Sequence, residues 1–158
     1  MKTAKTWEGT PYTPRYILKI LVPGSGKYAG SNPVKDEGAD CSGATWKIYE
    51  EAGFSYGSYQ STATFRTLVG ADNDKEMKGK HFKQVSTPQV GDIGWWNGHM
   101  AIYDLNAGKT DKGLDGNVWS VSNPKSTRPF GPGLIKWYDN DYKAPAKWYR
   151  YWKAGTPK

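Results

Sequence analysis

Residues 36–53, DEGADCSGATWKIYEEAG, decide the fold of this chain, because they predict one helix with both of its ends marked. Asp40 suits the N-cap position, since its short carboxylate can accept hydrogen bonds from the free N–H groups of a first helical turn. The apolar and aromatic residues that follow recur at spacings of four, one and three, which is typical of one helix face. Gly53 suits the left-handed position just beyond a helix end. We therefore predict a helix that begins at Cys41.

Cys41 is the only cysteine in the chain, which excludes an internal disulfide framework and a cysteine-rich metal site. A cysteine in the first turn of a helix has free backbone N–H groups and the helix dipole beside it, and both favour a thiolate. The same N–H groups could hold an oxyanion, and the small neighbours Ser42 and Gly43 would let a substrate approach. The carboxylate of Asp40 would oppose ionisation. On position alone, a buried structural cysteine is the favoured interpretation.

The rest of the chain predicts an α+β fold, with helices first and an antiparallel sheet after them. We expect an extended or loosely ordered lead-in over residues 1–15, a helix end or short strand over 16–22, and a second helix over 59–70. Short segments rich in β-branched and aromatic residues then predict strands over 81–85, 91–96, 99–105, 116–123, 134–139 and 146–152. The length of 158 residues fits a single domain, 1–158.

The formal net charge is +7, from 22 Lys and Arg against 15 Asp and Glu, which suits an anionic partner. The lysines are spread along the chain and no nucleic-acid-binding signature is visible, so we expect no nucleic-acid partner. No apolar segment has the length of a signal peptide or a membrane span, so we expect cytoplasmic synthesis without a leader and no membrane insertion. We also expect a monomer that needs no metal or cofactor.

The two histidines have different surroundings in the sequence. His99 opens an apolar strand directly after a tight turn, where its ring could face a cleft and act as a base. His81 lies in a basic segment, which makes a poor environment for a base, and we interpret it as an exposed structural residue. The next predicted strand offers Ser120, Ser122 and Asn123 as possible orienters of the His99 ring.

Taken together, Asp-Cys-Ser-Gly at 40–43, Gly-Asp at 91–92 and His-Met-Ala-Ile-Tyr at 99–103 resemble the NlpC-type family of papain-like cell-wall cysteine peptidases. The resemblance spans about residues 24–123 and reverses the interpretation of the cysteine. It implies a papain-like α+β fold in which a nucleophile at a helix N-terminus packs on an antiparallel sheet. Cys41 would be the nucleophile and His99 the general base and later the general acid.

The resemblance also implies further site residues. Tyr28, in the loop before the cysteine, matches a substrate-site tyrosine, and Ser42 would lie beside the substrate. The third catalytic position of the family is usually a histidine on the next strand, and here it aligns with Ser120, which is a departure from the family. Asn123 could take that role, as in the related CHAP amidases and endopeptidases. Asp92 is interpreted as a turn and packing residue.

The implied activity is hydrolysis of an amide bond in the stem peptide or cross-link of peptidoglycan. Since that polymer lies outside the cytoplasm, something other than a leader would have to deliver the enzyme. A small catalytic domain of this kind resembles the type VI secretion amidase effectors, which implies an antibacterial toxin acting in the periplasm and a cognate immunity protein in the producer. The alternatives are a phage-type CHAP-like endolysin and a non-catalytic cell-wall-binding module.

Overall fold

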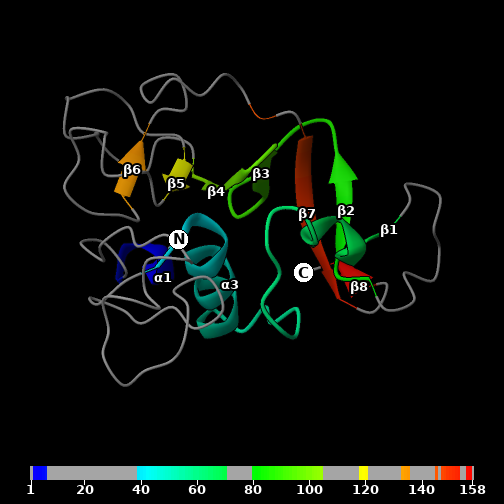
Figure 1. The fold of residues 1–158 in the computed structure, drawn as a ribbon, viewed down its shortest axis with the longest axis horizontal. Coiled ribbons are helices and arrows are strands. Elements are labelled where there is room, and N and C mark those ends of the chain that lie inside the picture. Colours follow the sequence, from blue (N-terminus) through cyan, green and yellow to red (C-terminus); the bar gives the residue numbers. More distant parts are fainter. Residues whose placement is uncertain are drawn as a thin grey trace.

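The computed structural model describes residues 2–6, 39–70, 80–104, 118–120, 133–135, 145, 147–153 and 156–157. Its helices are α1 (Lys2–Thr6), α3 (Cys41–Glu51) and the short 3-10 helix η1 (Phe65–Leu68). The strands are β1 (Val69–Gly70), β2 (Phe82–Val85), β3 (Ile93–Trp96), β4 (His99–Tyr103), β5 (Val118–Ser120), β6 (Gly133–Ile135), β7 (Lys147–Lys153) and β8 (Thr156–Pro157) (Figure 1).

The described strands form a sheet in the order β1-β2-β7-β3-β4-β5-β6, and β8 pairs with β7. Each neighbouring pair is antiparallel except β1 and β2, which run parallel. The expected α+β class is therefore confirmed, and a strand overlaps each segment that predicted one. Strand β7, close to the end of the sequence, lies inside the sheet between β2 and β3. Segments about 60 residues apart in the sequence are thus brought side by side.

Both predicted ends of helix α3 are confirmed. The Asp40 carboxylate accepts a hydrogen bond from the backbone N–H of Gly43 at 2.6 Å. At the other end, Gly53 has a φ of 85°, a left-handed conformation that costs glycine little. The N–H of Gly53 donates to the carbonyl of Glu50 at 3.1 Å, and the N–H of Phe54 donates to that of Tyr49 at 2.8 Å. These two bonds satisfy carbonyls that the end of the helix would otherwise leave unpaired.

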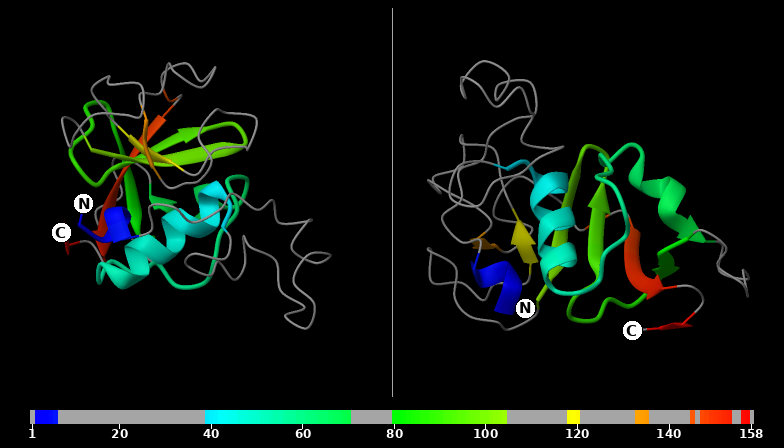
Figure 2. Two further views of the ribbon diagram at one scale, coloured as in Figure 1. Left: turned by 90° about the vertical axis from the view of Figure 1, so that its left-hand side faces the viewer. Right: turned by 90° about the horizontal axis from the view of Figure 1, so that it is seen from below.

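Helix α3 lies on one face of the sheet, with α1 beside it (Figure 2). Its buried side chains Ala44, Ile48 and Tyr49 join a largely aromatic cluster built from β2, β3, β4, β5 and β7. The members contributed by these strands are Phe82, Ile93, Met100, Ile102, Trp119, Tyr149 and Tyr151. A smaller cluster contains Ala101 and Val118, with Trp96, Tyr103 and Trp148 against it. Because neighbouring side chains of β4 enter different clusters, both faces of this strand are buried.

Two expectations for the helices are wrong. Residues 2–6 form α1 rather than an extended lead-in. The predicted helix over 59–70 is reduced to η1, and Val69 and Gly70 pair with β2 instead. The sheet explains the early end, because Val69 pairs with Phe82 and Gly70 with Lys83, which holds both residues in an extended conformation. Residues 16–22 lie outside the described part of the chain.

Within the described residues, no helix combines the length and the apolar character that a membrane crossing requires.

Candidate active site

Cys41 is the first residue of α3, and its side chain is buried. Three backbone N–H groups, those of Cys41 itself, Ser42 and Met100, act on the sulfur and lower its pKa. The first two belong to the start of the helix, where N–H groups have no partner within the helix. The third belongs to β4, where Met100 directly follows His99. The start of α3 and the start of β4 therefore meet at the thiol.

The electrostatic surroundings keep this thiol neutral. Burial raises the pKa of Cys41, and the charge of Asp40 raises it further, while the three N–H groups lower it. The net result is a pKa of about 12. Asp40 thus has opposite effects, because it caps the helix that presents the thiol and also opposes its ionisation. Only a small fraction of the thiol is ionised at neutral pH in this conformation.

His99 is the first residue of β4 and is buried. Burial lowers the pKa of its imidazole to about 4, so the ring is neutral at neutral pH and can accept a proton. The ring packs on Trp96, its partner in the ladder between β3 and β4, with 5.3 Å between ring centroids. Met100 lies in the cluster under α3, so strand alternation places the His99 side chain on the opposite face. The Cα of His99 is nevertheless only two bonds from the nitrogen that donates to the thiol.

Ser42, expected to lie beside the substrate, is buried and its hydroxyl is engaged. It donates to the Asp40 carboxylate at 3.2 Å and lies 3.0 Å from the hydroxyl of Tyr59. Tyr59 comes from the loop that follows α3, and its ring meets Trp46 of the helix edge-on, with 6.2 Å between centroids. The residues around the nucleophile are therefore connected by hydrogen bonds to the next loop.

That loop, residues 54–64, is held against the rest of the site by side chains from three different elements. The indole N–H of Trp46 donates to the carbonyl of Gly57 at 2.8 Å. The indole N–H of Trp95 on β3 donates to the carbonyl of Thr62 at 2.9 Å. The hydroxyl of Tyr151 on β7 donates to the carbonyl of residue 55, also at 2.9 Å. These bonds fix the position of the loop relative to both α3 and the sheet.

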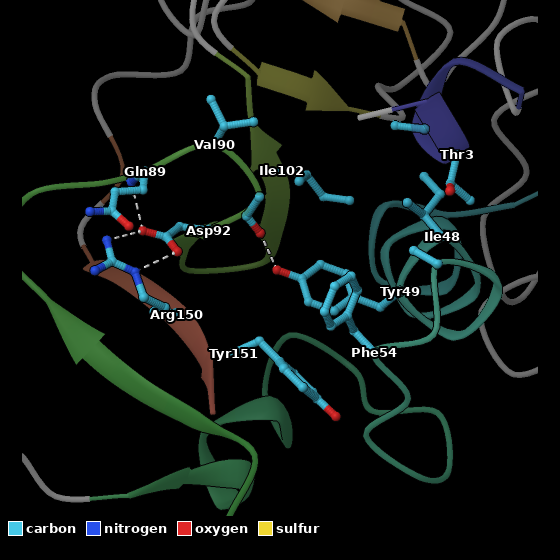
Figure 3. A pocket seen from close by; sticks show the side chains of 13 residues that line it. Thr3, Ile48, Tyr49, Phe54, Gln89, Val90, Asp92, Ile102, Arg150 and Tyr151 are labelled. Carbon is cyan, nitrogen blue, oxygen red and sulfur yellow. Dashed lines mark hydrogen bonds and ion pairs between the residues drawn. The ribbon is translucent and has the colours of Figure 1, made fainter. Parts of the chain in front are cut away.

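Asp92 is confirmed as a turn and packing residue. Its buried carboxylate accepts two hydrogen bonds from Arg150 of β7, at 3.1 and 2.8 Å, and one from the N–H of Gln89 at 2.7 Å. The pair borders a pocket of about 250 Å³ at the far end of α3, against Ile48 and Tyr49 (Figure 3). Since Cys41 does not line this pocket, the pocket is separate from the thiol.

The structure describes only some of the remaining predicted site residues. Ser120 ends β5, the neighbour of β4, and its backbone pairs with Gly133. Tyr28 and Asn123 lie outside the described residues, so the third catalytic residue stays a prediction.

His81 is half-buried and stacks on Tyr151, at 6.4 Å between ring centroids, so the expectation that it is exposed is wrong. Within the described ranges, no three His, Cys, Asp or Glu side chains are grouped so that they could hold a metal ion.

The sequence alone did not point to three residues of the site, which are Tyr59, Trp96 and Met100. Tyr59 and Met100 carry no recognisable signal, because each contributes through a contact with a residue far away in the sequence. Trp96 could have been found, since Asn97 and Gly98 form a two-residue sequence typical of a tight hairpin turn. Such a turn places the residues on either side of it opposite each other, as the pairing of Trp96 with His99 shows.

Comparison of the chain with protein-family models, with curated proteins and with solved structures finds no match.

Proposed function

We propose that this chain is a cysteine-dependent peptidoglycan hydrolase with a papain-like, NlpC-type fold. The observation that carries the proposal is the packing of α3 against β4, with the Met100 N–H acting on the Cys41 thiol, because it joins the two segments on which the resemblance depends. Fifty-five residues lie between these two segments, 40–43 and 99–103, in the sequence. A thiol nucleophile needs a base within hydrogen-bond reach, and His99, the residue before Met100, supports the proposal as the candidate base.

The chemistry starts from two neutral groups. His99 takes the proton of the Cys41 thiol as the sulfur attacks the carbonyl carbon of a stem-peptide amide. The backbone N–H groups of the helix start then stabilise the oxyanion. The protonated imidazole gives its proton to the leaving amine, and the C–N bond breaks to leave a thioester. A water molecule deprotonated by His99 hydrolyses the thioester and restores the thiol.

This pose requires the imidazole to turn around the end of β4, away from Trp96 and toward the sulfur. Because the ring is buried and lies on the face of β4 opposite α3, this movement involves the backbone at the start of β4 and not rotation about side-chain bonds alone. Catalytic hydrogen bonds are often formed only when substrate is bound. Transfer of the thiol proton at the same time as attack on the carbonyl avoids a separate thiolate–imidazolium ion pair, which a buried site disfavours.

The biological setting follows from the same chemistry and stays a proposal. The net charge of +7 suits an anionic cell-wall polymer. A toxin delivered into the periplasm of a target bacterium, with an immunity protein in the producer, fits an enzyme that must be harmless where it is made. A phage-type CHAP-like endolysin is the second candidate, and Asn123 as the third catalytic residue would favour it.

The test is digestion of purified sacculi, followed by mass analysis of the released fragments. We expect the wild type to release peptide-containing fragments and Cys41→Ala and His99→Ala to release none. His81→Ala is the matched control for the histidine, because it removes the other imidazole of the chain and should leave activity in place. If wild type releases nothing, or if Cys41→Ala still releases fragments, the hydrolase proposal is wrong.

The same variants separate an enzyme from a wall-binding module. We expect Cys41→Ala to sediment with sacculi as the wild type does, since the thiol is buried and contributes little to the surface. A protein that sediments with sacculi but never changes their composition would be a binding module.

A further inference from the structure

We propose that Tyr59 is a positioning residue of the Cys41 site, whose hydroxyl supports the Asp40 carboxylate through Ser42. Its importance for catalysis rests on the proposed function, whereas its effect on the thiol does not. The three groups form a chain of hydrogen bonds: Tyr59 to Ser42 at 3.0 Å, and Ser42 to Asp40 at 3.2 Å. The chain ends on the residue that caps α3 immediately before the cysteine.

The direction of each bond follows from proton counting. An ionised carboxylate can only accept, so the Ser42 hydroxyl must donate its single proton to Asp40. The oxygen of Ser42 can then only accept from Tyr59, whose hydroxyl is therefore the donor. The same Asp40 oxygen also accepts from the N–H of Gly43 at 2.6 Å. Hydrogen bonds connected in this way polarise and strengthen one another.

Tyr59 is held in place for this role. Its ring is half-buried and meets Trp46 edge-on, at 6.2 Å and 70°. Trp46 also donates from its indole to the carbonyl of Gly57, so one side chain of α3 fixes both the ring and the loop that carries it. A tyrosine has few rotatable bonds, so a ring packed in this way can present its hydroxyl with little loss of entropy.

The consequence concerns the charge beside the thiol. Among the described residues, Asp40 at the helix start is the charged group that acts on the Cys41 thiol, and the His99 side chain lies on the opposite face of β4. His99 is neutral, so Asp40 is the charge that opposes the thiolate. Each hydrogen bond donated toward Asp40 draws negative charge away from the sulfur. Removal of the Tyr59 hydroxyl should therefore make the thiol harder to ionise.

The experiment measures alkylation of Cys41 by iodoacetamide over a range of alkaline pH. The signal is unambiguous because the chain has one cysteine. We expect Tyr59→Phe to react about three- to tenfold more slowly than wild type at a given pH, equivalent to a thiol pKa raised by about half a unit to one unit. Tyr151→Phe is the matched control, because it also removes a hydroxyl that holds this loop but has no link to Asp40. An unchanged or faster rate in Tyr59→Phe, or an equal loss in Tyr151→Phe, would overturn the assignment.

A double-mutant cycle tests the route through Ser42. Ser42→Ala interrupts the chain, so Tyr59→Phe should cause no further change in the Ser42→Ala background. An equal effect of Tyr59→Phe in both backgrounds would mean that the hydroxyl does not act through Ser42, and the proposal would fall. Alkylation needs no peptidoglycan, so the result is independent of whether sacculi are digested.

Discussion

Acid should destabilise this protein through His99, and the size of the effect can be worked from its burial. The pKa of the imidazole is lowered from 6.5 to about 4 in the folded chain. The unfolded chain therefore binds this proton first, and the free energy of unfolding falls as the pH falls through the interval between these two values. Between about pH 7.5 and about pH 4.5, the linkage relation gives a loss of about 2.5 kcal/mol from this one group.

The assay is urea unfolding of wild type and His99→Gln at both pH values. Carboxylates titrate in the same interval, but they do so in both proteins, and the comparison cancels their contribution. We expect wild type to lose about 2.5 kcal/mol more than His99→Gln between the two pH values. The pKa itself can be measured by proton NMR in His81→Gln, where the remaining imidazole signal belongs to His99. An equal loss of stability in both proteins, or an imidazole that titrates above pH 6, would refute the reasoning.

Three further predictions concern stability and are measured by urea unfolding at neutral pH. Tyr56→Phe should stabilise the fold by about 1 kcal/mol, because the buried Tyr56 hydroxyl has no hydrogen-bond partner; a loss of stability would contradict this. Arg150→Ala should cost about 3 kcal/mol, because it leaves the buried carboxylate of Asp92 without its ion pair, and Arg150→Lys should recover only part of the loss. Gly94→Ala should cost about 2 kcal/mol, since the added Cβ would lie 2.8 Å from the ring of Trp148; an unchanged midpoint would show that the ring can move.

The elements of the fold could be predicted where local chemistry determines them. Helix α3 has a capping carboxylate at one end and a glycine at the other, and both signals act over a few residues. The strands were found by their β-branched and aromatic composition. The helix over 59–70 was predicted wrongly, because the pairing of Val69 and Gly70 with β2 outweighs the local helix propensity.

The candidate site was predictable to the extent that it depends on motifs. Cys41 at a helix start and His99 at a strand start were both expected, and the structure places them there. The neutral state of the Cys41 thiol and the His99 imidazole could not be predicted, because it depends on burial, which no local sequence pattern measures. The contribution of Tyr59 was also missed, since its hydroxyl meets a residue 17 positions away.

The sequence by itself determined which residues can do chemistry: one thiol, its capping carboxylate, and a histidine after a tight turn. Only the tertiary structure decided that the N–H of Met100 reaches the thiol and that Asp40 is linked to the following loop. It also decided that the imidazole packs on Trp96. The physical reason is the distance along the sequence over which each kind of interaction acts. Caps, turns and strand propensities act within a few residues, whereas burial and hydrogen bonds between distant segments exist only once the sheet has assembled.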